Sequence, residues 1–160
     1  MPHTRPTTDI AKEGLFNILQ NNLEIEELKV LDLFGGTGCI SYELASRGAP
    51  DITIVEKDTQ MYDFIKKTAA MLEFEKFNVV KQDVFRFMDM AHEQYDFIFA
   101  GPPYALATID DLPLKVFDKN LLKPKGWFVL EHTPRNEYKK FAHYKTERNY
   151  GTTIFSIFIN

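Results

Sequence analysis

Short runs of apolar residues recur along the chain, and polar or turn-forming residues bound each of them. Runs of this length without strict alternation are typical of strands in a parallel sheet, where both faces of each strand are covered. The pattern predicts strands at 29–34, 51–56, 78–83, 95–100 and 126–132.

Between these runs, apolar residues return every three or four positions, which is the spacing of amphipathic helices. Gly48 predicts the end of the second helix, and Thr7, Thr8 and Asp9 are candidates for the N-cap of the first. The predicted helices are 10–23, 38–47, 59–72, 84–91 and 109–119. The stripe expected to face the core is Ala11, Leu15, Ile18, Leu19 and Leu23 in the first helix, and Met61, Phe64, Ile65, Thr68 and Leu72 in the third.

The end of the chain, 143–160, alternates around "YGTTIFSIFI" and predicts a hairpin that turns near Gly151. Strands that alternate with helices require right-handed crossovers. The predicted fold is therefore α/β: a Rossmann-like, doubly wound, mainly parallel seven-stranded sheet with a C-terminal antiparallel hairpin and helices on both faces.

Chain length, composition and net charge limit the classes of protein to which this chain can belong. A chain of 160 residues fits one domain, 1–160, with a substantial core. No apolar run is long enough to span a membrane, and the N-terminus lacks the apolar core of a signal peptide. Cys39 is the single cysteine and no zinc-ligand spacing occurs, so we expect no disulfide, no metal and a cytoplasmic location. The net charge of −4 argues against strong autonomous binding to nucleic acid.

Ligands of such sheets bind beyond the carboxyl ends of the strands, so the residues at those ends are candidates. The first strand ends in a turn with Gly35, Gly36 and Gly38, which permit close backbone approach to a ligand. The pattern Gly36-x-Gly38-x-x-Ser41 is the dinucleotide fingerprint without its third glycine. The turn predicts a nucleotide-like ligand or, alternatively, an ordinary strand-to-helix connection.

Two acids follow at the next strand ends. Glu56 is placed to accept the ribose hydroxyls of an adenosine, or it is a surface acid paired with Lys57. Asp83 is placed to accept the adenine amino group, or it caps the following helix, and both roles are compatible. Glycine turn, acid and acid at three strand ends favour an adenosyl ligand.

The fourth strand ends in Gly101-Pro102-Pro103-Tyr104. Proline has no N–H and fixes its own φ, so this turn presents carbonyl acceptors on a stiff backbone. Such acceptors suit an exocyclic amine, and the Tyr104 ring is suited to stack on its base. The alternative is a rigid turn with a buried tyrosine.

These motifs together resemble those of class I S-adenosylmethionine-dependent methyltransferases. More narrowly, the chain resembles the RsmD-like family, which methylates the exocyclic amine of a guanine in 16S ribosomal RNA. The resemblance rests on "RPTTDIAKEGLFNIL" (5–19), "LDLFGGTG" (31–38), "SRGA" (46–49), "GPPY" (101–104), "LEH" (130–132) and "YGTTIFSIF" (150–158). Two departures stand out: Gly101 replaces the Asp or Asn of the family's (D/N)PP(Y/F) motif, and only four residues precede Arg5, where the family carries a basic segment.

The resemblance implies S-adenosylmethionine as cofactor, ribosomal RNA within a small-subunit particle as partner, and a monomer. It implies a catalytic turn of Gly101, Pro102, Pro103 and Tyr104, and substrate contacts from Arg5, Tyr104 and Glu131. The implied cofactor-binding residues are Thr8, Asp32, Phe34, Gly35, Gly36, Gly38, Glu56, Lys57, Asp83 and Val84.

Because Gly101 removes one acceptor of the amine, we expect weakened activity. The alternatives are a weakened methyltransferase-fold protein that serves as a cofactor- or RNA-binding module, an amino-methyltransferase for DNA or another substrate, and a dinucleotide-dependent reductase. Glu131 and His132, at the end of the fifth strand, are either structural or compensate for the missing acceptor.

Overall fold

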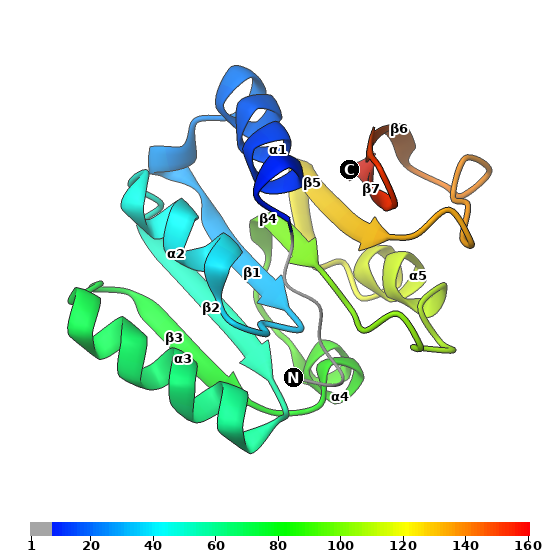
Figure 1. The fold of residues 1–160 in the computed structure, drawn as a ribbon. Helices are drawn as coiled ribbons and strands as arrows, with labels where there is room; N and C mark the ends of the chain where they lie inside the picture. The colour runs from blue at the N-terminus through cyan, green and yellow to red at the C-terminus, as the bar shows by residue number, and fades with distance from the viewer. Residues whose placement is uncertain (1–7) are drawn as a thin grey trace.

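A computed structural model describes residues 8–160, which form a seven-stranded sheet in the order β3-β2-β1-β4-β5-β7-β6 (Figure 1). Strands β1 to β5 pair in parallel, while β7 runs antiparallel to both β5 and β6. The predicted doubly wound sheet with its terminal hairpin is therefore confirmed. The strands are β1 (Lys29–Leu33), β2 (Asp51–Glu56), β3 (Phe77–Lys81), β4 (Tyr95–Ala100), β5 (Leu122–His132), β6 (Tyr144–Tyr150) and β7 (Thr153–Ile159).

Helices cover both faces of this sheet. The first three helices lie on one face, and the last two lie on the other (Figure 1). The helices are α1 (Asp9–Asn22), α2 (Cys39–Ser46), α3 (Thr59–Leu72), α4 (Val84–Met90) and α5 (Asp111–Asp118), with a short 3-10 helix at Ile25–Glu27. No helix among residues 8–160 combines the length and the apolar character that a membrane span requires.

Successive residues of the central strands enter opposite halves of the core. In β4, Phe97 and Phe99 pack under α1 and α2, whereas Ile98 and Ala100 pack against α4 and α5. This is the strand alternation of a sheet that is buried on both faces, and it explains why β4 is apolar almost throughout.

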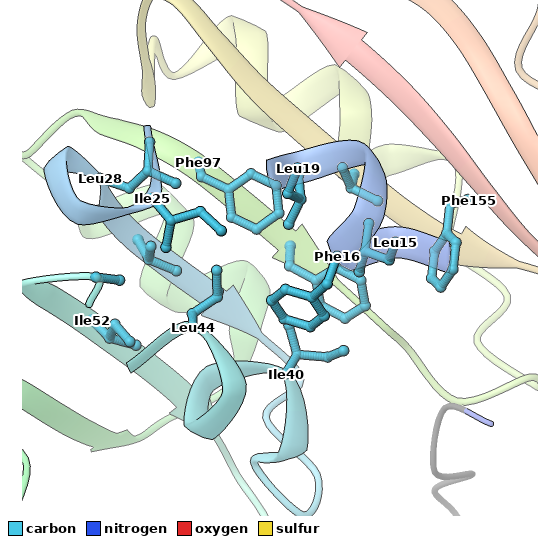
Figure 2. Packing of buried hydrophobic residues seen from close by; sticks show 14 of the residues in the cluster. Leu15, Phe16, Leu19, Ile25, Leu28, Ile40, Leu44, Ile52, Phe97 and Phe155 are labelled. Atoms are coloured by element: carbon cyan, nitrogen blue, oxygen red, sulfur yellow. The ribbon is translucent and has the colours of Figure 1, made fainter. Parts of the chain in front are cut away.

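Helix α1 packs its predicted stripe against the middle of the sheet. Figure 2 shows Leu19 of α1 directed toward Phe97 of β4, and Phe16 directed toward Ile40 of α2. The Thr8 hydroxyl accepts the Ala11 N–H at 3.3 Å, so the predicted N-cap is confirmed. Within the stripe, Ile18 and Leu23 are only partly buried.

The structure corrects the predicted stripe of α3. Met61 and Ile65 are buried as expected, but Phe64 is 49% and Leu72 50% exposed. Helix α3 lies over β2 and the edge strand β3, so the sheet covers only a narrow strip of it. The helical spacing was sufficient to predict α3 but not the width of its buried face.

Strand β5 begins at Leu122 rather than at 126, which is the largest boundary error. Pro124 and Gly126 read as turn residues, and Lys125 adopts a left-handed φ of 67°. The strand nevertheless continues through a register shift against β4, because such an irregularity absorbs the distorted residues. Strand β3 ends at Lys81, so Asp83 lies beyond it, and the hairpin turns at Gly151 as predicted.

Candidate active site

The order of the strands reverses between β1 and β4, which lie side by side in the centre of the sheet. Leu33 and Ala100, the last residues of these strands, are paired in register. A reversal of this kind leaves a crevice beyond the carboxyl ends of the strands. The predicted glycine turn follows β1 and the predicted proline turn follows β4, so the two motifs meet at this crevice.

The glycine turn after β1 is strongly bent. Phe34, Gly36 and Gly38 have left-handed φ values of 61°, 57° and 82°, and the Gly38 N–H donates to the Gly35 carbonyl at 2.8 Å. A Cβ at Gly35 would lie 2.3 Å from Cγ2 of Ile54, so no larger residue fits there. Phe34 is the one residue of this turn that adopts the left-handed conformation despite its side chain, which is the kind of backbone strain that clusters at ligand sites.

Glu56, at the end of β2, holds this turn. Its carboxylate is buried and accepts the Gly36 N–H at Oε1 and the Asp58 N–H at Oε2, each at 2.9 Å. The alternative of a surface acid paired with Lys57 is therefore wrong, and Lys57 itself is exposed. Because a carboxylate has about four acceptor positions, Glu56 keeps capacity for the hydroxyls of a ligand.

Asp32, at the end of β1, is buried beneath the turn and accepts the Ser41 hydroxyl at 2.7 Å. The pKa of Asp32 is raised to about 7, chiefly by burial; the hydrogen bond from Ser41 opposes this rise, and the charges of Glu56 and Glu131 add to it. This mutual influence means that acids from β1, β2 and β5 converge on one small region of the crevice.

Asp83 and Val84 lie where β3 passes into α4. The Asp83 carboxylate accepts the Arg86 N–H at 3.1 Å, so its capping role is confirmed. The neighbouring Gln82 N–H donates to the Glu56 carbonyl at 3.2 Å, which fixes Asp83 beside the end of β2. Val84 is buried against the core.

The turn after β4 presents its acceptors as the sequence predicts. The Pro103 carbonyl accepts the Leu106 N–H at 3.1 Å, but within residues 8–160 no donor reaches the Pro102 carbonyl. The Tyr104 side chain is 52% exposed, so the alternative of a rigid turn around a buried tyrosine is wrong.

A pocket opens beside this turn. Glu131 and His132 of β5 form part of its wall, and Oε1 of Glu131 lies 3.3 Å from the place that a Cβ of residue 101 would occupy. The complete lining is Pro102, Pro103, Tyr104, Ile109, Glu131, His132, Thr133 and Asn136.

His132 is held inside this wall. Its Nδ1 donates to the Thr133 carbonyl at 2.8 Å, so Nε2 accepts the Ser156 hydroxyl at 2.7 Å. Burial lowers the pKa of His132 and favours this neutral ring. The structural role that the sequence allowed for His132 is therefore confirmed.

Sequence reasoning missed several residues of the site. Ser41 was noted only because it occupies the position of the third glycine of the dinucleotide fingerprint, although its hydroxyl donates a hydrogen bond to Asp32. It also missed Ile109, Thr133 and Asn136, whose only signal was their position shortly after predicted strands. The predicted contact Arg5 lies outside the described residues.

The predicted resemblance is confirmed at the level of the family. The model of the family described as "Conserved hypothetical protein 95" matches residues 1–159. The chain belongs to the conserved hypothetical protein 95 family.

Across the described residues, 8–160, no group of three or more His, Cys, Asp or Glu side chains could hold a metal ion.

Similar proteins extend this assignment. The ribosomal RNA small subunit methyltransferase D of Buchnera aphidicola subsp. Baizongia pistaciae is 26% identical, over 98% of this chain and 81% of that protein. The protein of the same name from Escherichia coli K12 is 30% identical over 81% of this chain, which spans only 62% of that protein.

Solved structures of similar fold include a conserved hypothetical protein of Streptococcus pyogenes, with 28% identity and a TM-score of 0.83 over 93% of this chain and 94% of that one. A 16S rRNA N2 methyltransferase of Thermus thermophilus, solved with AdoMet and guanosine, is 23% identical with a TM-score of 0.75, over 96% of this chain and 44% of that one. This second likeness concerns the fold alone.

Proposed function

We propose that this member of the conserved hypothetical protein 95 family is an S-adenosylmethionine-dependent methyltransferase that acts on the exocyclic amine of a guanine in 16S ribosomal RNA. The observation that carries the proposal is that two turns of different chemistry follow adjacent strands, β1 and β4, and border the same crevice. A glycine turn held by Glu56 lies on one side of it, and a proline turn with an open acceptor lies on the other. The names of the relatives support the same activity and substrate class.

The acids of the crevice fit this cofactor better than a dinucleotide. Asp32 and Glu56 are buried near the glycine turn, and Glu131 adds a third carboxylate. The carboxylates of Glu56 and Glu131 disfavour a pyrophosphate, whereas they attract the positive sulfonium of S-adenosylmethionine; Asp32, whose pKa is raised to about 7, adds less charge. This charge distribution argues against a dinucleotide-dependent reductase.

Each strand end would then hold one part of the cofactor. The turn from Gly35 to Gly38 offers close backbone contact, Glu56 accepts the ribose hydroxyls, and Asp83 accepts the adenine amino group. The remaining residues that we propose to line the site are Thr8, Asp32, Phe34, Lys57 and Val84.

The cofactor supplies a methyl group that is already activated, so the chain's task is to bind, orient and exclude water. The Pro102 carbonyl accepts one N–H of the target amine, and the exposed Tyr104 ring stacks on the base. These contacts hold a planar, weakly nucleophilic amine in the orientation that transfer requires.

Gly101 bears on the rate of this reaction. It contributes no side-chain acceptor, and loss of one preorganised polar contact lowers a rate by about 10²–10³. We therefore expect slower transfer than in a relative with Asp or Asn at this position. The same observation favours a second candidate function, in which the protein binds cofactor or RNA as an assembly module.

A ribonucleoprotein substrate fits the charge of the chain. The net charge is −4, and the loop at 133–143, which contributes to the pocket, is a basic exception with Arg135, Lys139 and Lys140. We propose a single-domain, metal-free, cytoplasmic monomer that acts on a small-subunit particle, whose own proteins help to shape the RNA. An amino-methyltransferase for DNA is the alternative substrate assignment.

Mass mapping of methylated guanines in 16S RNA, from cells with and without this protein, tests the proposal. We expect one guanine to lose its methyl group when the protein is absent. In parallel, saturating S-adenosylhomocysteine should raise the melting temperature of the purified protein, because it binds only the folded state. A thermal shift without any change in RNA methylation would favour the binding module, and the absence of both would contradict the cofactor assignment.

A further inference from the structure

The backbone conformation at position 101 does not require a glycine. The φ of Gly101 lies outside the left-handed region, so its backbone is open to other residues. A Cβ at this position would meet Cε2 of Phe99 at 3.2 Å and Oε1 of Glu131 at 3.3 Å, contacts that need shifts of only a few tenths of an ångström. The carboxylate of Glu131, on the neighbouring strand, therefore lies next to the space that a side chain at position 101 would occupy.

Glu131 reaches this place because of the pairing between β4 and β5. Leu130 lies opposite Ala100, so the next residues, Glu131 and Gly101, lie side by side where the chain leaves β4. The Glu131 side chain is 6% exposed and contributes to the pocket together with Pro102 and Tyr104.

We propose that the Glu131 carboxylate serves as the side-chain acceptor for the target amine, in place of the missing side chain at position 101. One N–H of the amine donates to the Pro102 carbonyl and the other donates to Glu131. The inference rests on the proposed function of this site, and it supplies the side-chain acceptor that methyl transfer by a chain with Gly101 requires.

The charge of Glu131 suits the reaction as well as its position does. As the amine nitrogen forms its bond to the methyl carbon, the bond between carbon and sulfur breaks and its electron pair stays on sulfur. The nitrogen gains positive charge and then sheds one proton to the Glu131 carboxylate. A carboxylate next to a developing positive charge stabilises the transition state more than the neutral carbonyl of Pro102 does.

A double-mutant cycle with Glu131→Gln and Gly101→Asn tests the proposal. Gly101→Asn adds an acceptor without placing a second carboxylate against Glu131. The measurement is single-turnover methyl transfer to small-subunit particles that lack the modification. Glu131→Gln should lower the rate by about 10²-fold in the natural chain, but by less than about tenfold in the Gly101→Asn background.

Two controls show that these changes act on transfer. Glu75→Gln makes the same chemical change at an exposed acid beside β3 and should leave the rate unchanged. Affinity for S-adenosylhomocysteine, measured by calorimetry, should agree within a factor of a few among all variants, which also demonstrates that they are folded.

A second measurement does not depend on turnover. Inosine lacks the exocyclic amine of guanosine, so the ratio of their affinities for the protein saturated with S-adenosylhomocysteine reports the contacts to that amine. Glu131→Leu, which has no acceptor, should lower this preference for guanosine by about tenfold, the equivalent of one hydrogen bond.

The outcomes separate this inference from the proposed function. If Glu131→Gln lowered the transfer rate equally in both backgrounds, or in neither, the proposed role of Glu131 would be overturned. Methyl transfer by the natural chain would still support the proposed methyltransferase function. An unchanged preference for guanosine in Glu131→Leu would overturn it independently. If the natural chain transferred no methyl group and did not prefer guanosine, the proposed function itself would fail and the inference with it.

Discussion

The carboxyl ends of β1, β2 and β3 carry acids whose hydrogen bonds are already made within the chain, whereas the turn after β4 leaves an acceptor open beside a pocket. Glu56 binds two backbone N–H groups, Asp32 binds Ser41, and Asp83 caps α4. On the other side, the Pro102 carbonyl receives no donor within residues 8–160.

This difference separates two kinds of site residue. In the first region, which we call the cofactor side, each acid accepts a hydrogen bond from the chain, so a substitution affects folding and ligand binding together. In the second, the substrate side, the Pro102 carbonyl is open and the φ of Gly101 is one that other residues adopt. A change at this turn should therefore affect contacts to the substrate more than the hydrogen bonds that hold the fold.

The largest effect that we expect on the cofactor side comes from Asp32. Its pKa is raised to about 7 by burial and by neighbouring acids, so the folded protein holds a proton that the unfolded chain releases near pH 4. Its contribution to stability is therefore complete below pH 4 and is lost as pH rises through 7. Between pH 5 and pH 8 this group alone should cost roughly 2–3 kcal/mol of the free energy of unfolding.

Urea unfolding of the natural chain and of Asp32→Asn at both pH values measures this cost. The amide oxygen that this substitution introduces still accepts the Ser41 hydroxyl, but the amide does not titrate. The stability of the variant relative to the natural chain should therefore rise toward pH 8. Asp89→Asn is the control. Lys115 lowers the pKa of the exposed Asp89 carboxyl, so Asp89 stays ionised from pH 5 to pH 8 and Asp89→Asn should show no such rise. A difference between Asp32→Asn and the natural chain that does not change with pH would contradict the account of a buried, protonated Asp32.

Glu56 tests whether the cofactor side also binds the cofactor. Glu56→Ala should weaken S-adenosylhomocysteine binding by roughly 1–3 kcal/mol, because it leaves the ribose hydroxyls and the Gly36 N–H without their acceptor. Calorimetry measures this affinity directly. Glu75→Ala, which removes an exposed acid next to β3, should have no effect. Unaltered binding in Glu56→Ala would mean that Glu56 shapes the turn without touching the ligand.

The sequence was sufficient to predict the strands, helices and turns that surround the site. Strand runs, helical spacing and the glycine turn are local signals, and Glu56 and Asp83 followed from their places at strand ends. The pattern could not reveal that Glu56 binds the Gly36 N–H, since that contact depends on how β1 and β2 pair. For the same reason, the sequence could not reveal the raised pKa of Asp32, because that shift depends chiefly on burial of Asp32 in the assembled sheet and, to a smaller extent, on Glu56 and Glu131 from β2 and β5.

The substrate side was harder to predict for a different reason. Thr133 and Asn136 lie in a loop with no apolar period, so nothing in the sequence marked them as part of a pocket. Phe64 and Leu72 show the converse error. Their helical spacing predicted that they are buried, but they are half exposed because α3 lies near the edge of the sheet. Local patterns predict elements well, but pockets and edges depend on how those elements assemble.

Asp83 separates the two roles that the sequence allowed. Asp83→Ala should cost about 1 kcal/mol of stability through loss of the α4 cap. Asp83→Ser keeps a capping oxygen but removes the carboxylate, so it should restore stability while affinity for S-adenosylhomocysteine stays about tenfold lower. Thermal unfolding and calorimetry on both variants decide the question. If the Ser variant binds like the natural chain, Asp83 acts only as a cap.

The smallest effect per residue should come from the basic loop on the substrate side. Arg135, Lys139 and Lys140 are exposed on 133–143, and the buried Tyr138 anchors this loop through a hydrogen bond from its hydroxyl to Asp110 at 2.9 Å. Each phosphate contact to a single strand contributes about −0.7 to the slope of log affinity against log salt. A chain with a net charge of −4 should therefore bind naked RNA weakly and with a shallow slope.

Replacing the three basic residues of the loop by Gln should make that slope shallower by about 2, with little change in affinity for S-adenosylhomocysteine. The same three-charge change at Lys66, Lys67 and Lys76, which lie on α3 and beside β3, provides the control. Fluorescence anisotropy with a 16S RNA fragment across a salt series gives both slopes. Equal changes in the two triple variants would show that RNA responds only to net charge, and the distinction between a cofactor side and an RNA-facing substrate side would then fail at this loop.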